Sequence, residues 1–262
     1  MLLAIDSGNT NIVFAVFNAE NKLCGEWRAA SNVNRTSDEF SVWLQQLMKL
    51  DNITKDSIKN AIIGNVVPAN LLSLQNLCRN YFGCEPLLIG DANINLGMEL
   101  LVDNPNEVGA DRICNAVSAF STYGGPVTVI DFGTATSFDV VDIHGNYLGG
   151  VIAPGINLSL EALHMGAAQL PRVAVEVTKH IIGKNTVSAI QSGVFWGYVS
   201  MIEGLSARVK KEMGCDMPIV ATGGLAAIFT KSTKSIDHWD KTLTLRGLLD
   251  IYGLNGYRTN YS

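Results

Sequence analysis

Apolar residues along this chain fall into short runs that are separated by longer segments with helical spacing. The runs at 2–5, 60–64, 86–89 and 218–221 are bounded by polar or glycine-containing turns, which is typical of buried strands. The segments between them are long enough for helices of several turns. Strands therefore alternate with helices, and the pattern predicts an α/β protein.

The helical segments have recognisable ends. After a capping box formed by Thr36 and Glu39, apolar residues recur at i, i+3, i+4 and i+7, as on one face of a helix. Residues 68–82 begin with a proline suited to a first turn and stop at Gly83. A third helix is expected over 109–123.

A fourth helix is expected through the region 191–203, with Thr186 as its N-cap. Gly193, Gly197 and Gly204 interrupt it. Glycines inside a helical pattern indicate close packing on another helix, within the chain or across a dimer.

The strongest regularity is an internal repeat. Residues 2–17 and 127–141 both read as a buried strand, an aspartate, a glycine-centred turn rich in hydroxyl side chains, and a second strand. The two aspartates, Asp6 and Asp131, are separated by close to half the chain. This pattern predicts a duplicated domain in which each half opens with a β-meander.

The domain boundary is expected near the end of the third predicted helix, which stops at Gly124 and Gly125. We expect an N-terminal half over 1–118 and a C-terminal half over 119–262.

Composition narrows the functional classes. The formal net charge is −5, which disfavours the basic footprint that non-specific nucleic-acid binding requires. The five cysteines form no CxxC pair, so neither a zinc site nor a disulfide framework is indicated. The N-terminus lacks a secretory pattern, and no run is long enough to span a membrane. We expect a cytoplasmic protein without nucleic-acid or membrane partners.

The repeated turn has the chemistry of a phosphate site. Glycine allows close backbone approach, and turn N–H groups with hydroxyl and amide side chains can donate to phosphate oxygens. The candidates in the first turn are Asp6, Ser7, Gly8, Asn9, Thr10 and Asn11. The second turn offers Asp131, Gly133 and Thr134, and a later strand leads into Gly223 and Gly224. One such turn alone would be read as an ordinary hairpin, but two in matching halves favour phosphate binding.

Residues 104–112 are a further candidate, and their spacing leaves two interpretations open. Asp111 is either a first-turn acid that stabilises a helix N-terminus or a general base toward a substrate hydroxyl. Arg112 is either a surface charge or a ligand for an anionic group.

The segment 104–112, NPNEVGADR, resembles the NPxEVGADR signature of type III pantothenate kinases. Five other motifs fall into register with the same family: DSGNTN at 6–11, DFGTAT at 131–136, GGVIAPG at 149–155, KNT at 184–186 and ATGG at 221–224. The resemblance covers about residues 1–255. It implies two ribonuclease H-like domains of the actin-like ATPase superfamily with a nucleotide cleft between them.

The family's function implies ATP-dependent phosphorylation of pantothenate, the first step of coenzyme A biosynthesis. By the resemblance, the first turn binds ATP with Asp6 near Mg²⁺, and Asp111 is the proton acceptor. Asp131 helps to hold a monovalent cation, K⁺ or NH₄⁺, and Thr134 contacts ATP. A homodimer is also implied.

The resemblance places Val102, Gly109, Ala110, Asp111, Arg112 and Thr186 at the pantothenate. Val102 is a departure, because the family usually has tyrosine there. Loss of the phenol is expected to weaken pantothenate binding by about 1 kcal/mol. Two rival functions remain: a kinase for another small alcohol, and a nucleotide-binding transcriptional accessory or regulatory protein that kept the fold.

Overall fold

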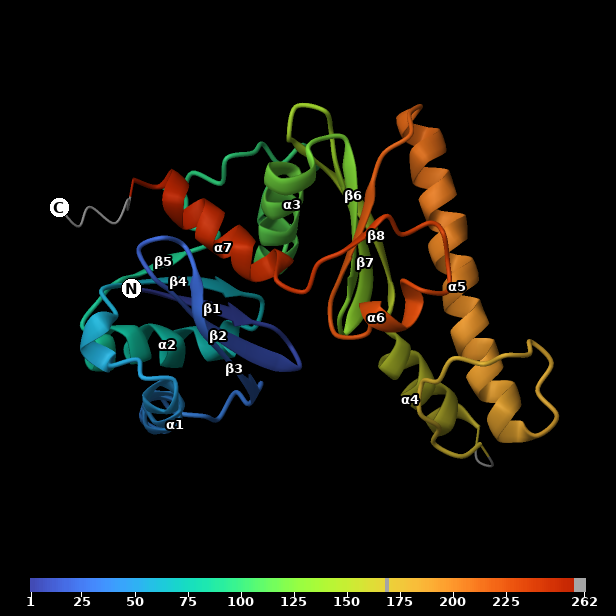
Figure 1. The fold of residues 1–262 in the computed structure, drawn as a ribbon, viewed down its shortest axis with the longest axis horizontal. Coiled ribbons are helices and arrows are strands. Elements are labelled where there is room, and N and C mark those ends of the chain that lie inside the picture. Colours follow the sequence, from blue (N-terminus) through green and yellow to red (C-terminus); the bar gives the residue numbers. More distant parts are fainter. Residues whose placement is uncertain (168–169, 257–262) are drawn as a thin grey trace. The chain divides into compact units, whose positions relative to one another are not determined.

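The computed structural model describes residues 1–167 and 170–256. The chain divides into two compact units, and each contains one five-stranded sheet (Figure 1). The first unit consists of residues 1–118 together with the chain from Thr242 onward, and the second of residues 119–241.

The sheet of the first unit has the strand order β3-β2-β1-β4-β5. Its strands are β1 (Leu2–Ser7), β2 (Asn11–Phe17), β3 (Leu23–Ala30), β4 (Asn60–Asn65) and β5 (Pro86–Leu88). The first three strands form an antiparallel meander, and β4 and β5 run parallel to β1.

Helices cover both faces of this sheet (Figure 1). They are α1 (Ser37–Leu50) and α2 (Pro68–Leu77) on one face, and α3 (Ala110–Tyr123) and α7 (Leu243–Leu254) on the other. Leu3 and Ile5 of β1 belong to the apolar cluster under α1 and α2, and Leu2 and Ala4 to the cluster under α3 and α7. Burial on both faces explains why β1 reads as an unbroken apolar run.

The predicted helix ends in this unit are confirmed. The Thr36 hydroxyl accepts the Glu39 N–H at 3.3 Å, and the Glu39 carboxylate accepts the Thr36 N–H at 2.8 Å. Helix α2 begins at Pro68 and continues as a π-helical turn, Cys78–Phe82, which ends at Gly83 with φ of 66°. Two 3₁₀ helices, Lys55–Ser57 and Pro105–Glu107, lie in connections.

The place of α7 differs from the expected division at 119–262, which assigned the whole C-terminal region to the second half. Leu245, Leu248 and Ile251 of this helix are buried in the cluster of the first unit. The helix returns because its apolar face has a partner in the face of the first sheet that α1 and α2 leave uncovered.

The sheet of the second unit has the order β10-β9-β6-β7-β8. Its strands are β6 (Val127–Phe132), β7 (Ala135–Val141), β8 (Tyr147–Pro154), β9 (Ile219–Thr222) and β10 (His238–Trp239). Strands β6, β7 and β8 form an antiparallel meander, while β9 and β10 continue the sheet in parallel from β6. This is the topology of the first sheet, so the predicted duplication of an α/β domain is confirmed.

Three helices belong to the second unit: α4 (Ile156–Gly166), α5 (Thr186–Met213) and α6 (Ala226–Phe229). Ile156, Phe195 and Phe229 bring them into one buried cluster with Ile130 and Phe138 of the sheet. This cluster lies on one face of the sheet.

The N-cap of α5 is Asn185, one residue before the Thr186 that the sequence indicated. The Asn185 side chain accepts the Ser188 N–H at 2.8 Å, and the Ser188 hydroxyl accepts the Asn185 N–H at 3.1 Å. Asn185 is the cap because it and Ser188, three residues later, form both hydrogen bonds of a capping box.

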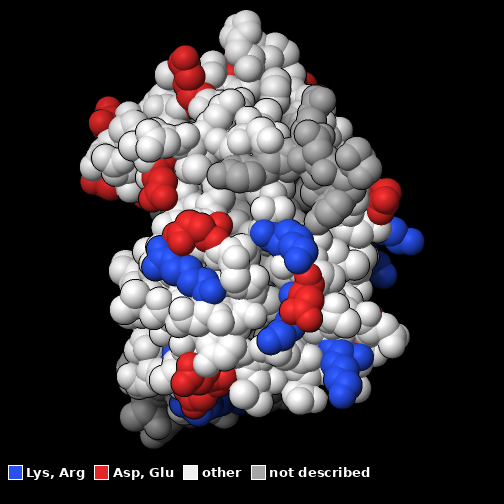
Figure 2. Space-filling view, turned by 90° about the vertical axis from the view of Figure 1, so that its left-hand side faces the viewer, with Lys and Arg blue, Asp and Glu red and all other residues white. Residues whose placement is uncertain are grey.

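Among the described residues, no helix combines the length and apolar character needed to cross a membrane. On the face drawn in Figure 2, basic and acidic side chains are interspersed, and neither sign forms a continuous patch.

Candidate functional site

The first glycine turn connects β1 and β2. Ser7 pairs with Ile12, and the Gly8 N–H donates to the Asn11 carbonyl at 3.0 Å, which closes the turn. Ser7 is fully buried, whereas Asn9, Thr10 and Asn11 are exposed. Their amide and hydroxyl groups are therefore the side chains of this turn that a ligand can reach.

Asp6 lies one residue before the turn, in the middle of three strands. It pairs with Val13 of β2 and Gly64 of β4. A Cβ on Gly64 would lie 3.2 Å from Leu248 Cδ2 and 3.7 Å from Ala110 Cβ, so the glycine lets α3 and α7 approach the sheet beside Asp6.

The segment that precedes α3 positions Asp111. Asn104 orders its start, because its side chain accepts the Asn106 N–H at 3.3 Å and donates to the Glu107 carboxylate at 2.7 Å. A Cβ on Gly109 would lie 2.6 Å from Asp111 Oδ1. Glycine at 109 thus leaves room for the carboxylate to fold back over the helix N-terminus.

The Asp111 carboxyl is half-buried, and its Oδ1 accepts the Arg112 N–H at 2.8 Å. Burial raises the pKa of Asp111, and the Arg112 N–H and the Arg112 charge offset part of that rise. A carboxylate that loses solvation in this way binds a proton more readily than an exposed one.

Three carboxylates of the first unit act electrostatically on Cys114, which is fully buried in α3. Burial raises the pKa of this thiol well above its ordinary value, and the charges of Asp6, Asp111 and Asp250 raise it further. Asp6 and the N-terminus of α3, which carries Asp111, therefore lie in the same part of the first unit, although 104 residues of sequence lie between the two aspartates.

Asp250, on α7, was missed by the sequence analysis. It is half-buried, and burial raises its pKa while Arg246 one turn earlier lowers it. It is the one acidic residue of the helix Leu243–Leu254, in which most residues are apolar. That isolation is the signal that could have found it.

The second glycine turn connects β6 and β7 and is closely surrounded. Phe132 pairs with Thr136, and the Gly133 N–H donates to the Ala135 carbonyl at 3.0 Å. A Cβ on Gly223, whose φ is +91°, would lie 2.5 Å from Asp131 Oδ1. A Cβ on Gly155 would collide with the Thr134 carbonyl.

These close approaches place Gly223 beside Asp131 and Gly155 beside Thr134 in the second unit. Gly155, from the GGVIAPG motif, is thereby added to the residues around the second turn. Gly224 has open space around its Cα.

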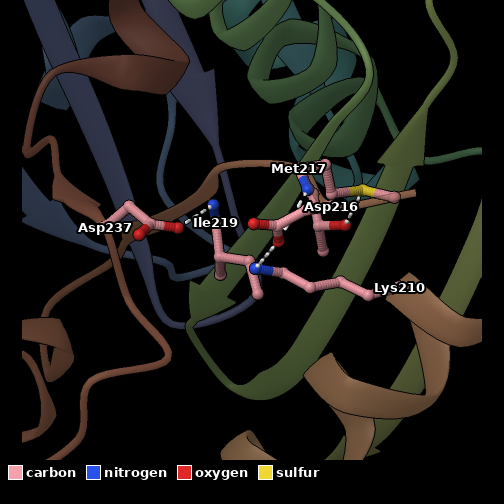
Figure 3. Close-up of polar contacts among 6 residues, drawn as sticks. Lys210, Asp216, Met217, Ile219 and Asp237 are labelled. Carbon is pink, nitrogen blue, oxygen red and sulfur yellow. Dashed lines mark hydrogen bonds and ion pairs between the residues drawn. The ribbon is translucent and has the colours of Figure 1, made fainter.

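Strand β9, which leads into Gly223, is anchored at its other end (Figure 3). Lys210 pairs with Asp216 at 2.6 Å, and the Met217 N–H donates to the same carboxylate at 3.1 Å. The Ile219 N–H donates to Asp237 at 2.8 Å. These contacts hold the strand in register with β6 and so fix where its glycine turn lies.

Thr186 lies elsewhere in the second unit, at the start of α5. It is exposed and lines a groove of about 930 Å³ together with Pro154, Ser159 and Tyr198. The Tyr198 hydroxyl donates to the Pro154 carbonyl at 2.6 Å and lies 2.9 Å from the Ser159 hydroxyl. Gly193 and Gly197 also line the groove, and among the described residues nothing packs on their Cα atoms.

Val102 is half-buried in the loop before the Pro105–Glu107 helix. The valine side chain has no hydrogen-bonding group. The hydroxyl that a tyrosine would carry is therefore missing at this position.

Comparisons with known proteins agree with these features. The model of a family described as type III pantothenate kinase matches residues 2–208. A type III pantothenate kinase of Paramagnetospirillum magneticum is 59% identical over 97% of this chain and 98% of its own length. One of Rhodospirillum rubrum is 56% identical over 97% of this chain and 99% of its own length.

Among solved structures, the chain is similar to the activator of 2-hydroxyisocaproyl-CoA dehydratase from Clostridium difficile, determined with bound ADPNP. The TM-score is 0.57 at 15% identity, over 97% of this chain and 94% of that one. This likeness supports the fold, which is that of the actin-like ATPases and sugar kinases.

Proposed function

The chain belongs to the type III pantothenate kinase family, and we propose that Asp111 is the base with which it carries out the reaction of that family. The reaction is phosphorylation of pantothenate by ATP to give 4′-phosphopantothenate, the first step of coenzyme A biosynthesis. The protein is accordingly a kinase that uses ATP.

The observation that supports the role of Asp111 is its place at the N-terminus of α3. There a Cβ on Gly64, the residue paired with Asp6, would lie 3.7 Å from Ala110 Cβ, and burial raises the pKa of Asp111. Oδ1 is occupied by the Arg112 N–H. Oδ2 is the atom that we assign to the proton of the attacking hydroxyl. Proton transfer to such a group contributes about 10²–10⁴-fold to a rate.

To catalyse phosphoryl transfer, a protein must position the nucleophile and the phosphates and stabilise the charge of the transition state. We assign the first turn, 6–11, and the second turn, with Gly133 and Thr134, to the phosphates of ATP. Gly223 and Gly224 are assigned to the nucleoside side. The exposed side chains of the first turn supply donors, and the glycines of the second keep the backbone accessible.

Asp6 is the residue assigned to Mg²⁺. Among the described residues no group of three or more His, Cys, Asp or Glu side chains is arranged to hold a metal ion. Mg²⁺ suits such a site, because it is usually bound through one or two carboxylates plus phosphate oxygens and water. When bound, it neutralises charge on the phosphates.

Asp131 is assigned to a monovalent cation, K⁺ or NH₄⁺. Glycine at 223 lets the β9 turn approach Asp131 Oδ1 more closely than a residue with a Cβ could. The carboxylate supplies oxygen atoms of the kind that hold K⁺, and this chemistry supports the assignment.

Pantothenate carries a carboxylate and a primary hydroxyl. We assign Gly109, Ala110, Asp111 and Arg112 to this substrate, with Arg112 as the partner of its carboxylate. Val102 and Thr186 are assigned to the same substrate.

We also propose a homodimer that forms through the α4 and α5 side of the second unit. Large apolar side chains are exposed there on α4 and α5: Leu158 at 52%, Met165 at 71% and Val187 at 43%. Gly193 and Gly197 would let a partner helix approach closely. Gel filtration with light scattering should give twice the 28.2 kDa chain mass, and Leu158→Glu should lower it to one chain.

The test of the function is ADP release from the purified protein with ATP and Mg²⁺, with and without pantothenate, in K⁺ and in Na⁺ buffer. ADP release that requires pantothenate and is faster in K⁺ is the expected result. ADP release with another alcohol but not with pantothenate would favour the alternative kinase. Nucleotide binding without turnover on any alcohol would favour the regulator.

A further inference from the structure

A polar cluster lies buried on one face of the second sheet, next to Asp131. Asp131 pairs directly with Ser137 across β6 and β7. Asp139 follows two residues later on β7 and so shares the face of Ser137. The other face carries Ile130, Phe132 and Phe138 in the apolar cluster under α4, α5 and α6.

The cluster is tied together by short hydrogen bonds. The Ser137 hydroxyl donates to Asp139 Oδ2 at 2.9 Å, and the Tyr147 hydroxyl donates to Asp139 Oδ1 at 2.8 Å. Asp139 is 0% exposed and Ser137 is 8% exposed. A buried carboxylate is costly unless it is hydrogen-bonded, and here both of its oxygens accept.

This arrangement decides what the Ser137 oxygen can do. A serine hydroxyl has one proton and two lone pairs. Because Asp139 takes the proton, the Ser137 oxygen can only accept on its remaining sides. Directly opposed residues on antiparallel strands have Cβ atoms about 4.5–5.5 Å apart, so the side chains of Ser137 and Asp131 start from neighbouring positions on the same face.

The first sheet lacks this feature. The residue paired with Asp6, the counterpart of Asp131, is Val13, which offers no oxygen. In the second sheet, two side chains with oxygen acceptors, those of Asp131 and Ser137, are paired. In the corresponding pair of the first sheet, only Asp6 has a side-chain oxygen. K⁺ is bound by sets of oxygen atoms that replace its hydration shell, and NH₄⁺ likewise requires acceptors.

We propose that Ser137 is a second oxygen ligand of the monovalent cation at Asp131, and that Asp139 is a positioning residue that keeps the Ser137 hydroxyl as an acceptor. This rests on the proposed cation role of Asp131. Tyr147 holds Asp139 in place from the other side.

The experiment compares wild type, Ser137→Ala, Asp139→Asn, Asp131→Asn and Thr128→Val. Two responses to replacing Na⁺ with K⁺ at constant ionic strength are measured: the half-activating K⁺ concentration for ADP release, and the shift in thermal unfolding. Thr128→Val is the control, because it removes a buried hydroxyl from β6 that donates to Met217 Sδ at 3.1 Å.

Ser137→Ala should raise the half-activating K⁺ concentration about fivefold, the factor expected for one lost hydrogen-bond-like contact, and shrink the K⁺-dependent thermal shift. Asp139→Asn should act in the same direction. Thr128→Val should change stability without changing either response.

Wild-type responses to K⁺ that survive unchanged in Ser137→Ala would overturn the assignment of Ser137 while leaving Asp131 in its role. A K⁺ response that survives in Asp131→Asn, or no response in wild type by either measurement, would overturn the cation role of Asp131 and this inference with it.

Discussion

The two Asp-x-Gly turns start from nearly the same sequence and end in different surroundings. In the first, four residues separate the paired Ser7 and Ile12, and in the second, three separate Phe132 and Thr136. Residues 9–11 of the first turn and 133–135 of the second are exposed, but the second turn also has Gly155 and Gly223 packed closely against its backbone and Asp131.

The neighbourhoods of the two aspartates differ as well. Asp6 shares its surroundings with Asp111 and Asp250, and the residue paired with it is Val13. Asp131 pairs with Ser137, which belongs to a buried hydrogen-bonded cluster. The duplicated element thus differs between the units in what lies opposite its aspartate: an apolar side chain in the first and a hydrogen-bonded hydroxyl in the second.

Removing the base of the first unit should have the largest effect. Asp111→Asn should lower kcat by about 10²–10⁴-fold while leaving nucleotide affinity near wild type, because the amide still accepts the Arg112 N–H. Steady-state ADP release and nucleotide titration measure the two effects. Asp103→Asn, an exposed acid in the preceding loop, is the matched control. Near wild-type turnover in Asp111→Asn would contradict its role as base.

The second largest effect is expected from disturbing the packing around the second turn. Gly223→Ala places a Cβ against Asp131 and the Phe132 backbone at a positive φ, so it should destabilise the protein by about 1–3 kcal/mol. Gly224→Ala meets open space and should be nearly neutral in stability. Urea unfolding of both variants measures the difference. Equal stabilities would show that the second turn tolerates a side chain at 223.

The pH dependence of the reaction should report the environment of Asp111. The base must be ionised to accept a proton, and burial raises its pKa, so activity should fall as pH drops through a value above that of an exposed aspartate. The acidic limb of kcat/KM for pantothenate measures this, with circular dichroism confirming that the fold persists. A limb at or below the ordinary aspartate value would exclude a buried base.

The smallest effect concerns the departure at 102. Val102→Tyr should lower the KM for pantothenate about fivefold, as expected for one added hydrogen bond, with kcat and the KM for ATP unchanged. Initial rates over a range of pantothenate concentrations measure it. An unchanged KM would mean that a phenol at this position does not reach the substrate.

Much of this protein was determined by sequence alone. The spacing of apolar residues and the local turn and cap residues were enough to predict β1, β6, the capping box at Thr36 and the helix that starts at Pro68. Each of these features depends on residues only a few positions apart. The repeated Asp turns and the GADR segment identified the family and singled out Asp6, Asp111 and Asp131.

Other features were decided only by tertiary structure. Aligning the two repeats residue by residue puts Ile12 opposite Ser137, but strand pairing makes Val13 the counterpart of Ser137, because the second turn is one residue shorter. The return of α7 to the first unit, the presence of Asp250 near Asp111, and the cluster of Ser137, Asp139 and Tyr147 likewise depend on contacts between distant segments. Which side chains meet is decided by strand register and helix packing, and neither is encoded in any local stretch of the chain.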